Sequence, residues 1–261
     1  MADPLSNNVE KFLFPEEGVL RGDFKGYFLT KRYNFIATLN NHRDLSDLFL
    51  HVDQDWVEAI ADLAQIHNPD WIVPVQLTIF CFRELRLAAE MLLSGCTTPG
   101  FSHLRSALES FVQAQKISRE PTLGAVWLCR DNERVEYDKH FKANFKANLF
   151  PDTSGFVHLH AIWQMLCDAG PHPSVISIGI ASSVTESQQD ISWALNFFEV
   201  RPDELTKNFL LMIMVSLEMY KFTYNAFHER LSLKPDRLKR LHAHLVRFQQ
   251  LRNLYGPPVS P

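Results

Sequence analysis

The sequence is poor in glycine and cysteine, and it lacks the short motifs that mark many enzyme folds. Only 10 of its 261 residues are glycine. It contains no glycine-rich phosphate loop, no dinucleotide-binding fingerprint and no G-x-S-x-G nucleophile motif. The four cysteines never form a C-x-x-C pair. These absences exclude P-loop nucleotide hydrolysis, Rossmann cofactor binding, α/β-hydrolase chemistry and a zinc-ribbon or thioredoxin-type site.

Long hydrophobic runs are also missing. The longest apolar stretch, Phe209 to Leu217, is roughly half the length that a membrane span requires. The first residues are polar and acidic, without the apolar core of a signal peptide. We therefore expect a cytoplasmic protein with reduced thiols and no membrane partner. We interpret 209–217 as part of a buried core helix.

Apolar residues recur at helical spacing along most of the chain. In the segment 101–118 they occupy Leu104, Leu108, Phe111 and Val112. Helices of this kind are expected at 24–39, 53–67, 74–94, 102–118, 132–148, 155–168, 204–231 and 236–255, with a shorter one before 51 and another around 127. This spacing predicts an all-α fold, a single-domain multi-helix bundle with a basic C-terminal helix.

Turn-forming residues predict where several helices begin and end. Asn68-Pro69 is expected to end one helix and Pro74 to lie in the first turn of the next. Gly95 should follow the end of that helix, and Ser102 should cap the one after it. The segment 174–192 is compatible with a short helix, an extended segment or a pair of strands.

Charge is distributed unevenly between the two ends. Residues 1–23 contain five acids and two bases, whereas 234–252 contain six bases and one acid. The overall net charge is −4, which argues against a surface covered in basic charge but permits a local basic patch. We therefore divide the chain into a flexible acidic segment (1–22), a helical bundle (23–233) and a basic amphipathic helix with a tail (234–261).

The C-terminal helix combines an apolar stripe with a basic face. The stripe consists of Leu238, Leu241, Leu245, Phe248 and Leu251. Three interpretations fit the basic positions: a solvated face, a subunit interface, or a surface that contacts the phosphates of nucleic acid. In the last case the contacting residues are Arg237, Lys239, Arg240 and Arg247.

Several arginines precede a histidine by a few residues. Arg134 precedes His140, and Arg237 precedes both His242 and His244. Helical ribonucleases of the HEPN type use an arginine and a histidine with four to six residues between them. About two such pairs are expected by chance in a chain of this composition, so the spacing alone does not establish a ribonuclease.

A longer stretch carries a family resemblance. The run RSALESFVQAQKISREPTLGAVWLCRDNERVEYDKHFKANFKANLFP, followed by HLHAIWQMLCDAGPHPS, resembles a family of uncharacterised bacterial all-helical proteins that are distantly similar to HEPN-type helical domains. The resemblance covers the middle and C-terminal two-thirds of the chain. It implies a protein that engages RNA, as a defence or toxin-type factor. If the protein is catalytic, Arg134 would stabilise phosphate charge and His140 would transfer a proton.

Two other groups of residues could hold a metal. His158, His160, Cys167, Asp168 and the proline-flanked His172 lie close in sequence, and a zinc site would draw on His160 and His172. Four glutamates lie inside apolar helical segments, at 84, 90, 109 and 218, but no Glu-x-x-His accompanies them, so a di-metal bundle is disfavoured. Ion pairs are the simpler role, for example Glu109 with Arg105. We expect no cofactor.

A non-catalytic role remains the main alternative. A helical scaffold could dimerise or dock a protein partner through its C-terminal helix. The sequence thus leaves two hypotheses, an RNA-engaging protein and a homo-oligomeric scaffold.

Overall fold

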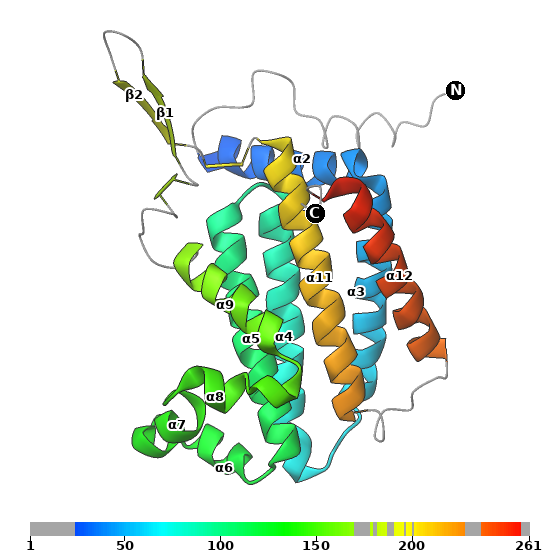
Figure 1. Cartoon of the computed structure of the whole chain (residues 1–261), viewed down its shortest axis with the longest axis vertical. Coiled ribbons are helices and arrows are strands. Elements are labelled where there is room, and N and C mark those ends of the chain that lie inside the picture. Colours follow the sequence, from blue (N-terminus) through cyan, green and yellow to red (C-terminus); the bar gives the residue numbers. More distant parts are fainter. Residues whose placement is uncertain are drawn as a thin grey trace.

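The computed structural model describes residues 24–169, 178–179, 182–186, 191–195, 197–199, 201–227 and 236–256. Within these ranges the chain is an all-α multi-helix bundle, as the periodicity predicted, with one short β-hairpin added. Five long helices run alongside one another (Figure 1). They are α3 (Arg43–Leu63), α4 (Pro69–Leu93), α5 (Thr97–Arg119), α11 (Pro202–Phe227) and α12 (Asp236–Tyr255).

The shorter elements cover the sides and ends of this bundle (Figure 1). Helix α2 (Phe24–Asn41) crosses one end, and α9 (Val157–Ala169) packs along α5. The opposite end holds α6 (Leu123–Leu128), α7 (Arg134–Phe141) and α8 (Phe145–Leu149), which are followed along the chain by the 3₁₀ turn η2 (Asp152–Ser154). Strands β1 (Ser182–Glu186) and β2 (Ile191–Leu195) form an antiparallel hairpin near the α2 end.

The hairpin partly answers the question left open at 174–192. Ser182 pairs with Leu195 and Glu186 pairs with Ile191, so the strand-pair alternative applies to 182–186 and extends three residues beyond 192. Residues 178–179 are helical. The other positions of this segment, and the acidic segment 1–22, lie outside the described residues.

Helices α4 and α5 form the most extensive helix pair in the bundle. Their connection is tight because Gly95 adopts a left-handed φ of 81°. The Gly95 N–H then donates to the Leu92 carbonyl and the Cys96 N–H to the Met91 carbonyl, which is the Schellman arrangement. A Cβ at Gly100 would lie 2.6 Å from the Leu92 side chain, so this glycine permits the close packing. The prediction that Gly95 follows the end of α4 is confirmed.

Several other helix boundaries differ from the prediction. Asn68-Pro69 starts α4, because the Asn68 side chain accepts from the Asp70 N–H at 3.0 Å and Pro69 occupies the first helical position. Helix α5 begins at Thr97, and Ser102 lies inside it with its hydroxyl donating to the Thr98 carbonyl. The segments on either side of 51 form the single helix α3.

The core centres on α3, α4, α5 and α11. Trp56 stacks on Phe82 with ring centroids 5.7 Å apart, and its indole N–H donates to the Ser216 hydroxyl at 3.1 Å. Phe209 and Ile213 are fully buried, so 209–217 belongs to a core helix, as predicted. None of the described helices has both the length and the apolar character needed to cross a membrane.

Candidate functional site

The basic residues of α12 face an acidic side of α3. Arg237 Nη1 lies 2.7 Å from the Asp62 carboxylate. Arg240 contacts two carboxylates, with Nη2 2.6 Å from Glu58 and Nε 2.8 Å from Asp55. These acids occupy successive turns of α3, at spacings of three and four residues. The positive charge of this part of α12 is therefore largely balanced within the bundle.

These pairs change the interpretation of the predicted phosphate-contacting residues. The Arg237 side chain is only 3% exposed, so it is not presented to an external phosphate. Arg240 is held between α3 carboxylates, and Arg247 lies 3.1 Å from the exposed Asp44. Lys239 is exposed and forms no ion pair within the described residues. The four residues do not form one accessible basic surface.

The apolar stripe of α12 packs largely against the chain's own core. Leu241, Phe248 and Leu251 are buried in the same hydrophobic cluster as α3 and α11, whereas Leu238 is exposed. Helix α12 is thus an integral part of the bundle. A homo-oligomer formed through this helix stays a prediction.

Arg134 and His140 both lie on α7, but their side chains do not meet. Arg134 Nε pairs with Asp138 at 3.0 Å and lies over the Tyr137 ring. His140 Nε2 is 2.9 Å from Glu136 Oε1, on another side of the helix. A step of six residues separates two side chains by roughly 120° around a helix. The assignment of this pair to catalysis stays a prediction.

The predicted histidine site is only partly described. His160 is buried and stacks on Trp163, with ring centroids 5.8 Å apart. Burial lowers the pKa of this imidazole, with a smaller contribution from Lys146. His172 lies outside the described residues. No group of three or more His, Cys, Asp or Glu side chains suited to a metal occurs within the described ranges.

The four glutamates in apolar helices have separate partners. Glu84 pairs with His103 at 2.8 Å, and Glu90 pairs with Lys31 at 2.7 Å. Glu218 lies near Lys221 and His158. Glu109 pairs with Arg105, as the sequence predicted, with Arg105 Nε 2.8 Å from its Oε1. Ion pairing therefore accounts for all four, but the last one lines a cavity.

This cavity is a pocket of about 510 Å³ between α5, α9 and the end formed by α6 to α8. Four of its lining residues are basic: Arg105, Arg130, Arg134 and Lys142. Four are aromatic: Tyr137, Phe141, Phe145 and Trp163. Glu109 and Gln113 complete the lining. Its volume lies in the range of small-molecule sites, and its combination of cations and aromatic rings suits an anionic ligand with a flat ring.

The short helices around the pocket are fixed in place by a half-buried lysine. Lys116 Nζ, on α5, donates to the His140 carbonyl at 2.8 Å and to the Asn148 carbonyl at 3.1 Å. Burial lowers the pKa of this ammonium group. Between α7 and α8, Asn144 adopts a left-handed φ of 50°, which asparagine tolerates better than most residues. This turn splits the expected helix 132–148 and places Phe145 against the pocket.

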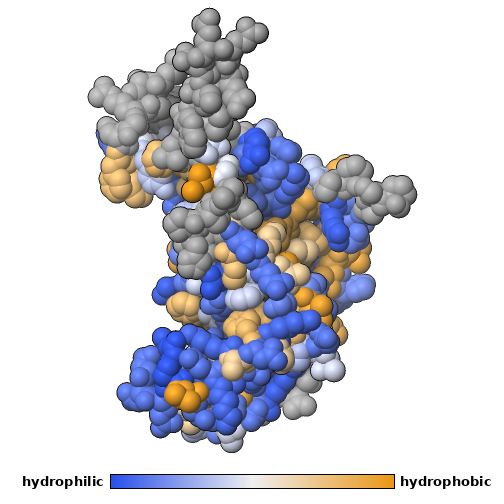
Figure 2. All heavy atoms as spheres, turned by 60° about the vertical axis from the view of Figure 1, so that its left-hand side comes forward, coloured by the Kyte–Doolittle hydropathy of each residue, from blue (hydrophilic) through white to orange (hydrophobic). Residues whose placement is uncertain are grey.

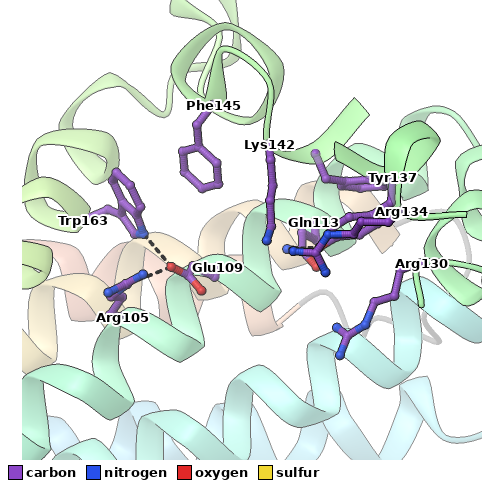
Figure 3. Close-up of a pocket in the computed structure, with 10 residues that line it drawn as sticks. Arg105, Glu109, Gln113, Arg130, Arg134, Tyr137, Lys142, Phe145 and Trp163 are labelled. Carbon is purple, nitrogen blue, oxygen red and sulfur yellow. Dashed lines mark hydrogen bonds and ion pairs between the residues drawn. The ribbon is translucent and has the colours of Figure 1, made fainter. Parts of the chain in front are cut away.

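One end of the pocket is built on Gln113, whose two amide atoms are both engaged. The Trp127 indole N–H donates to Gln113 Oε1 at 2.8 Å. Gln113 Nε2 donates in turn to the Tyr137 hydroxyl at 3.4 Å. Burial raises the pKa of Tyr137, so this hydroxyl stays protonated and can donate. Figure 3 shows Arg130 and Arg134 at the same end.

The other end of the pocket contains the acid and two stacked aromatic rings. The Trp163 indole N–H donates to Glu109 Oε1 at 3.0 Å, and Arg105 Nε donates to the same oxygen. Phe145 stacks on Trp163 with centroids 4.5 Å apart and planes 23° from parallel. In Figure 3 these four residues lie together, and Lys142 extends between them and the arginine end.

Two aspartates moderate the positive charge at the rim. Asp138 Oδ1 lies 3.0 Å from Arg134 Nε and 4.0 Å from Lys142 Nζ. Asp131 lies 3.4 Å from Arg130 Nε. These pairs are largely exposed, so water and salt screen them. The surface of this end of the molecule is mostly hydrophilic (Figure 2, bottom), and an incoming anion can compete for the bases.

Sequence reasoning found only part of this pocket. It paired Glu109 with Arg105 and singled out Arg134, but it did not connect Arg134 with that pair. The ten lining residues all fall within the two runs that carry the family resemblance. What the sequence could not supply is the turn at Asn144, which brings Phe145 next to Trp163. Comparisons with known protein families, with curated proteins and with solved structures found no match for this chain.

Proposed function

We propose that this chain binds single-stranded RNA through the pocket between α5, α7, α8 and α9. The main observation behind this proposal is that exposed cations and stacked aromatic rings line one cavity. Cations neutralise phosphates, and aromatic side chains stack on unpaired bases. The proposal agrees with the HEPN-like resemblance, but it moves the expected RNA contacts from the basic helix α12 to this pocket.

The arginine end supplies the phosphate contacts. Arg130, Arg134 and Lys142 are exposed, and their local carboxylate partners lie at the rim. A guanidinium can hold two phosphate oxygens at once, and a lysine adds a mobile point charge. The Tyr137 hydroxyl can donate to a third oxygen.

The aromatic end supplies a surface for a base. Trp163 and Phe145 are half-buried, so each keeps part of its ring accessible while the stack and the Glu109 bond hold the indole in place. Stacking on such a ring is worth about 1–3 kcal/mol per base. A base paired in a duplex could not reach this surface, which is why the proposal specifies a single strand.

The geometry favours binding over cleavage. His140 is not among the residues that line the pocket, and its ring is engaged by Glu136. Arg134 therefore acts as a phosphate ligand in this proposal. Catalysis by Arg134 and His140 would require His140 to move into the pocket.

The proposal is tested by fluorescence anisotropy with a labelled, unstructured 12-nucleotide RNA. Three phosphate contacts predict that log K falls with log salt with a slope of about −2. The double variant Arg130→Glu/Lys142→Glu should bind at least about tenfold more weakly and with a shallower slope.

A matched control carries the same change in charge elsewhere. Lys239 and Arg252 are exposed on α12, and Lys239→Glu/Arg252→Glu should retain nearly all of the affinity. Equal loss in both double variants would mean that only net charge matters. That result, or the absence of binding by the wild-type protein at low salt, would refute the proposal.

A further inference from the structure

Glu109 is the one carboxylate among the residues that line the pocket, and its two oxygens have different roles. Oε1 accepts from Arg105 Nε at 2.8 Å and from the Trp163 indole N–H at 3.0 Å. Oε2 has no donor among the described residues. Figure 3 shows both bonds ending on one oxygen, with the other directed away from both donors. The carboxylate is therefore fixed in orientation and keeps one unused acceptor.

The position of this acceptor matters because the pocket is polarised. Figure 3 shows Glu109 beside Phe145 and Trp163, with Arg130 and Arg134 at the far end. A nucleotide has the same polarity, with a flat base at one end and a phosphate at the other. If the phosphate is held by the arginines, the base reaches the aromatic end, and the edge of the base meets Glu109.

We propose that Glu109 makes the pocket selective for a base that carries an exocyclic amino group, and thus for cytosine over uracil. This inference rests on the proposed RNA binding. The cytosine 4-amino group can donate to a carboxylate oxygen. Uracil places a carbonyl oxygen at the same position, which cannot donate and is repelled by the negative charge. The two pyrimidines otherwise have nearly the same shape and stacking surface.

Arg105 does not cancel this selectivity. Its Nε is already used by Glu109 Oε1, and its guanidinium lies 5.7 Å from the Trp163 ring centroid. It therefore holds the carboxylate in a fixed orientation. Hydrogen bonds to a charged group are stronger than neutral ones, so the loss of one on replacing cytosine by uracil is expected to weaken binding about tenfold.

The test compares octamers of cytidine and of uridine against the wild-type protein at pH 7.5 and fixed salt. The wild type should bind the cytidine octamer about tenfold more tightly. In Glu109→Gln, the side-chain oxygen can still accept from Trp163 and Arg105, while the amide nitrogen can donate to the uracil carbonyl. This variant should lose the preference for cytidine and bind the uridine octamer at least as tightly as the cytidine octamer.

Glu136→Gln is the matched control. The Glu136 carboxylate on α7 is partly exposed, pairs with His140 and does not line the pocket. It should keep the wild-type preference. Equal binding of both octamers by the wild type, or a preference that survives Glu109→Gln, would overturn the inference while leaving RNA binding intact. Failure of both octamers and of the mixed 12-nucleotide RNA to bind would instead refute the proposed function.

Discussion

Removing the negative charge of Asp138 should strengthen RNA binding. Asp138 Oδ1 lies 3.0 Å from Arg134 Nε and 4.0 Å from Lys142 Nζ, so it competes with a phosphate for two of the three proposed phosphate ligands. Asp138→Asn keeps the size of the side chain and removes its charge. Most substitutions at a binding site weaken binding, so an increase is a demanding expectation.

The size of the gain follows from Coulomb's law. A phosphate held by the Arg134 guanidinium would lie roughly 6–7 Å from the Asp138 carboxylate. At that distance the repulsion is about 0.6 kcal/mol in bulk water and about 1.3 kcal/mol at an effective dielectric constant of about 40. The variant should therefore bind about three- to ninefold more tightly. The gain should shrink between 50 and 500 mM salt because the Debye length falls.

The assay is the anisotropy titration with the 12-nucleotide RNA, accompanied by thermal unfolding. Asp203→Asn is the control, since Asp203 lies 3.6 Å from Lys207 in a similar exposed pair at the start of α11, at the far end of the bundle (Figure 1). Both variants should unfold within a few degrees of the wild type, because exposed pairs contribute little to stability. Unchanged or weaker binding by Asp138→Asn would refute the assignment of Arg134 and Lys142 to phosphate.

Three further outcomes test the rest of the structure. Arg237→Ala should lower the free energy of unfolding by about 2 kcal/mol. This is less than the cost of breaking a fully buried pair, because Asp62 and Glu58 are partly exposed. Denaturant titration measures the loss, and the control Lys239→Ala should stay within about 0.5 kcal/mol of the wild type. His140→Ala should bind RNA with an affinity within about twofold of the wild type, measured by anisotropy. Because the pKa of buried His160 is lowered, the unfolded state binds more protons than the folded state, and stability should fall as pH drops below about 6.5. His160→Phe should reduce this dependence of stability on pH, which denaturant titrations at pH 7.5 and 5.5 will measure.

Much of the bundle could be predicted from the sequence because a helix is marked by the local spacing of its apolar residues and by the residue types at its ends. The period of the apolar residues located α5, α11 and α12, and Gly95 marked the end of α4. The errors occurred where one residue type serves two purposes. Asparagine followed by proline can end one helix, but it can equally cap the next one, and only the hydrogen bond from the Asp70 N–H decides between them.

The pocket was harder to predict because its parts come from four helices. Arg105 and Glu109 are one turn apart, so their pairing is visible in the sequence. The Trp163 indole reaches the same oxygen from 54 positions away, and no spacing rule records that contact. The left-handed turn at Asn144 is equally hidden, since nothing distinguishes it from an asparagine inside a polar helix.

Long-range pairing also determines which basic cluster can bind an anion. The guanidinium of Arg237 is buried against partly exposed α3 carboxylates, so presenting it to a phosphate would require breaking these ion pairs, at a cost of about 2 kcal/mol. The partner of Arg134 is a partly exposed residue one turn along the same helix, and pairs of this kind on a helix surface are worth about 0.3–0.5 kcal/mol. A phosphate can displace the second partner but not the first. The pocket at α6 to α8, with fewer bases than α12, is therefore the better anion site.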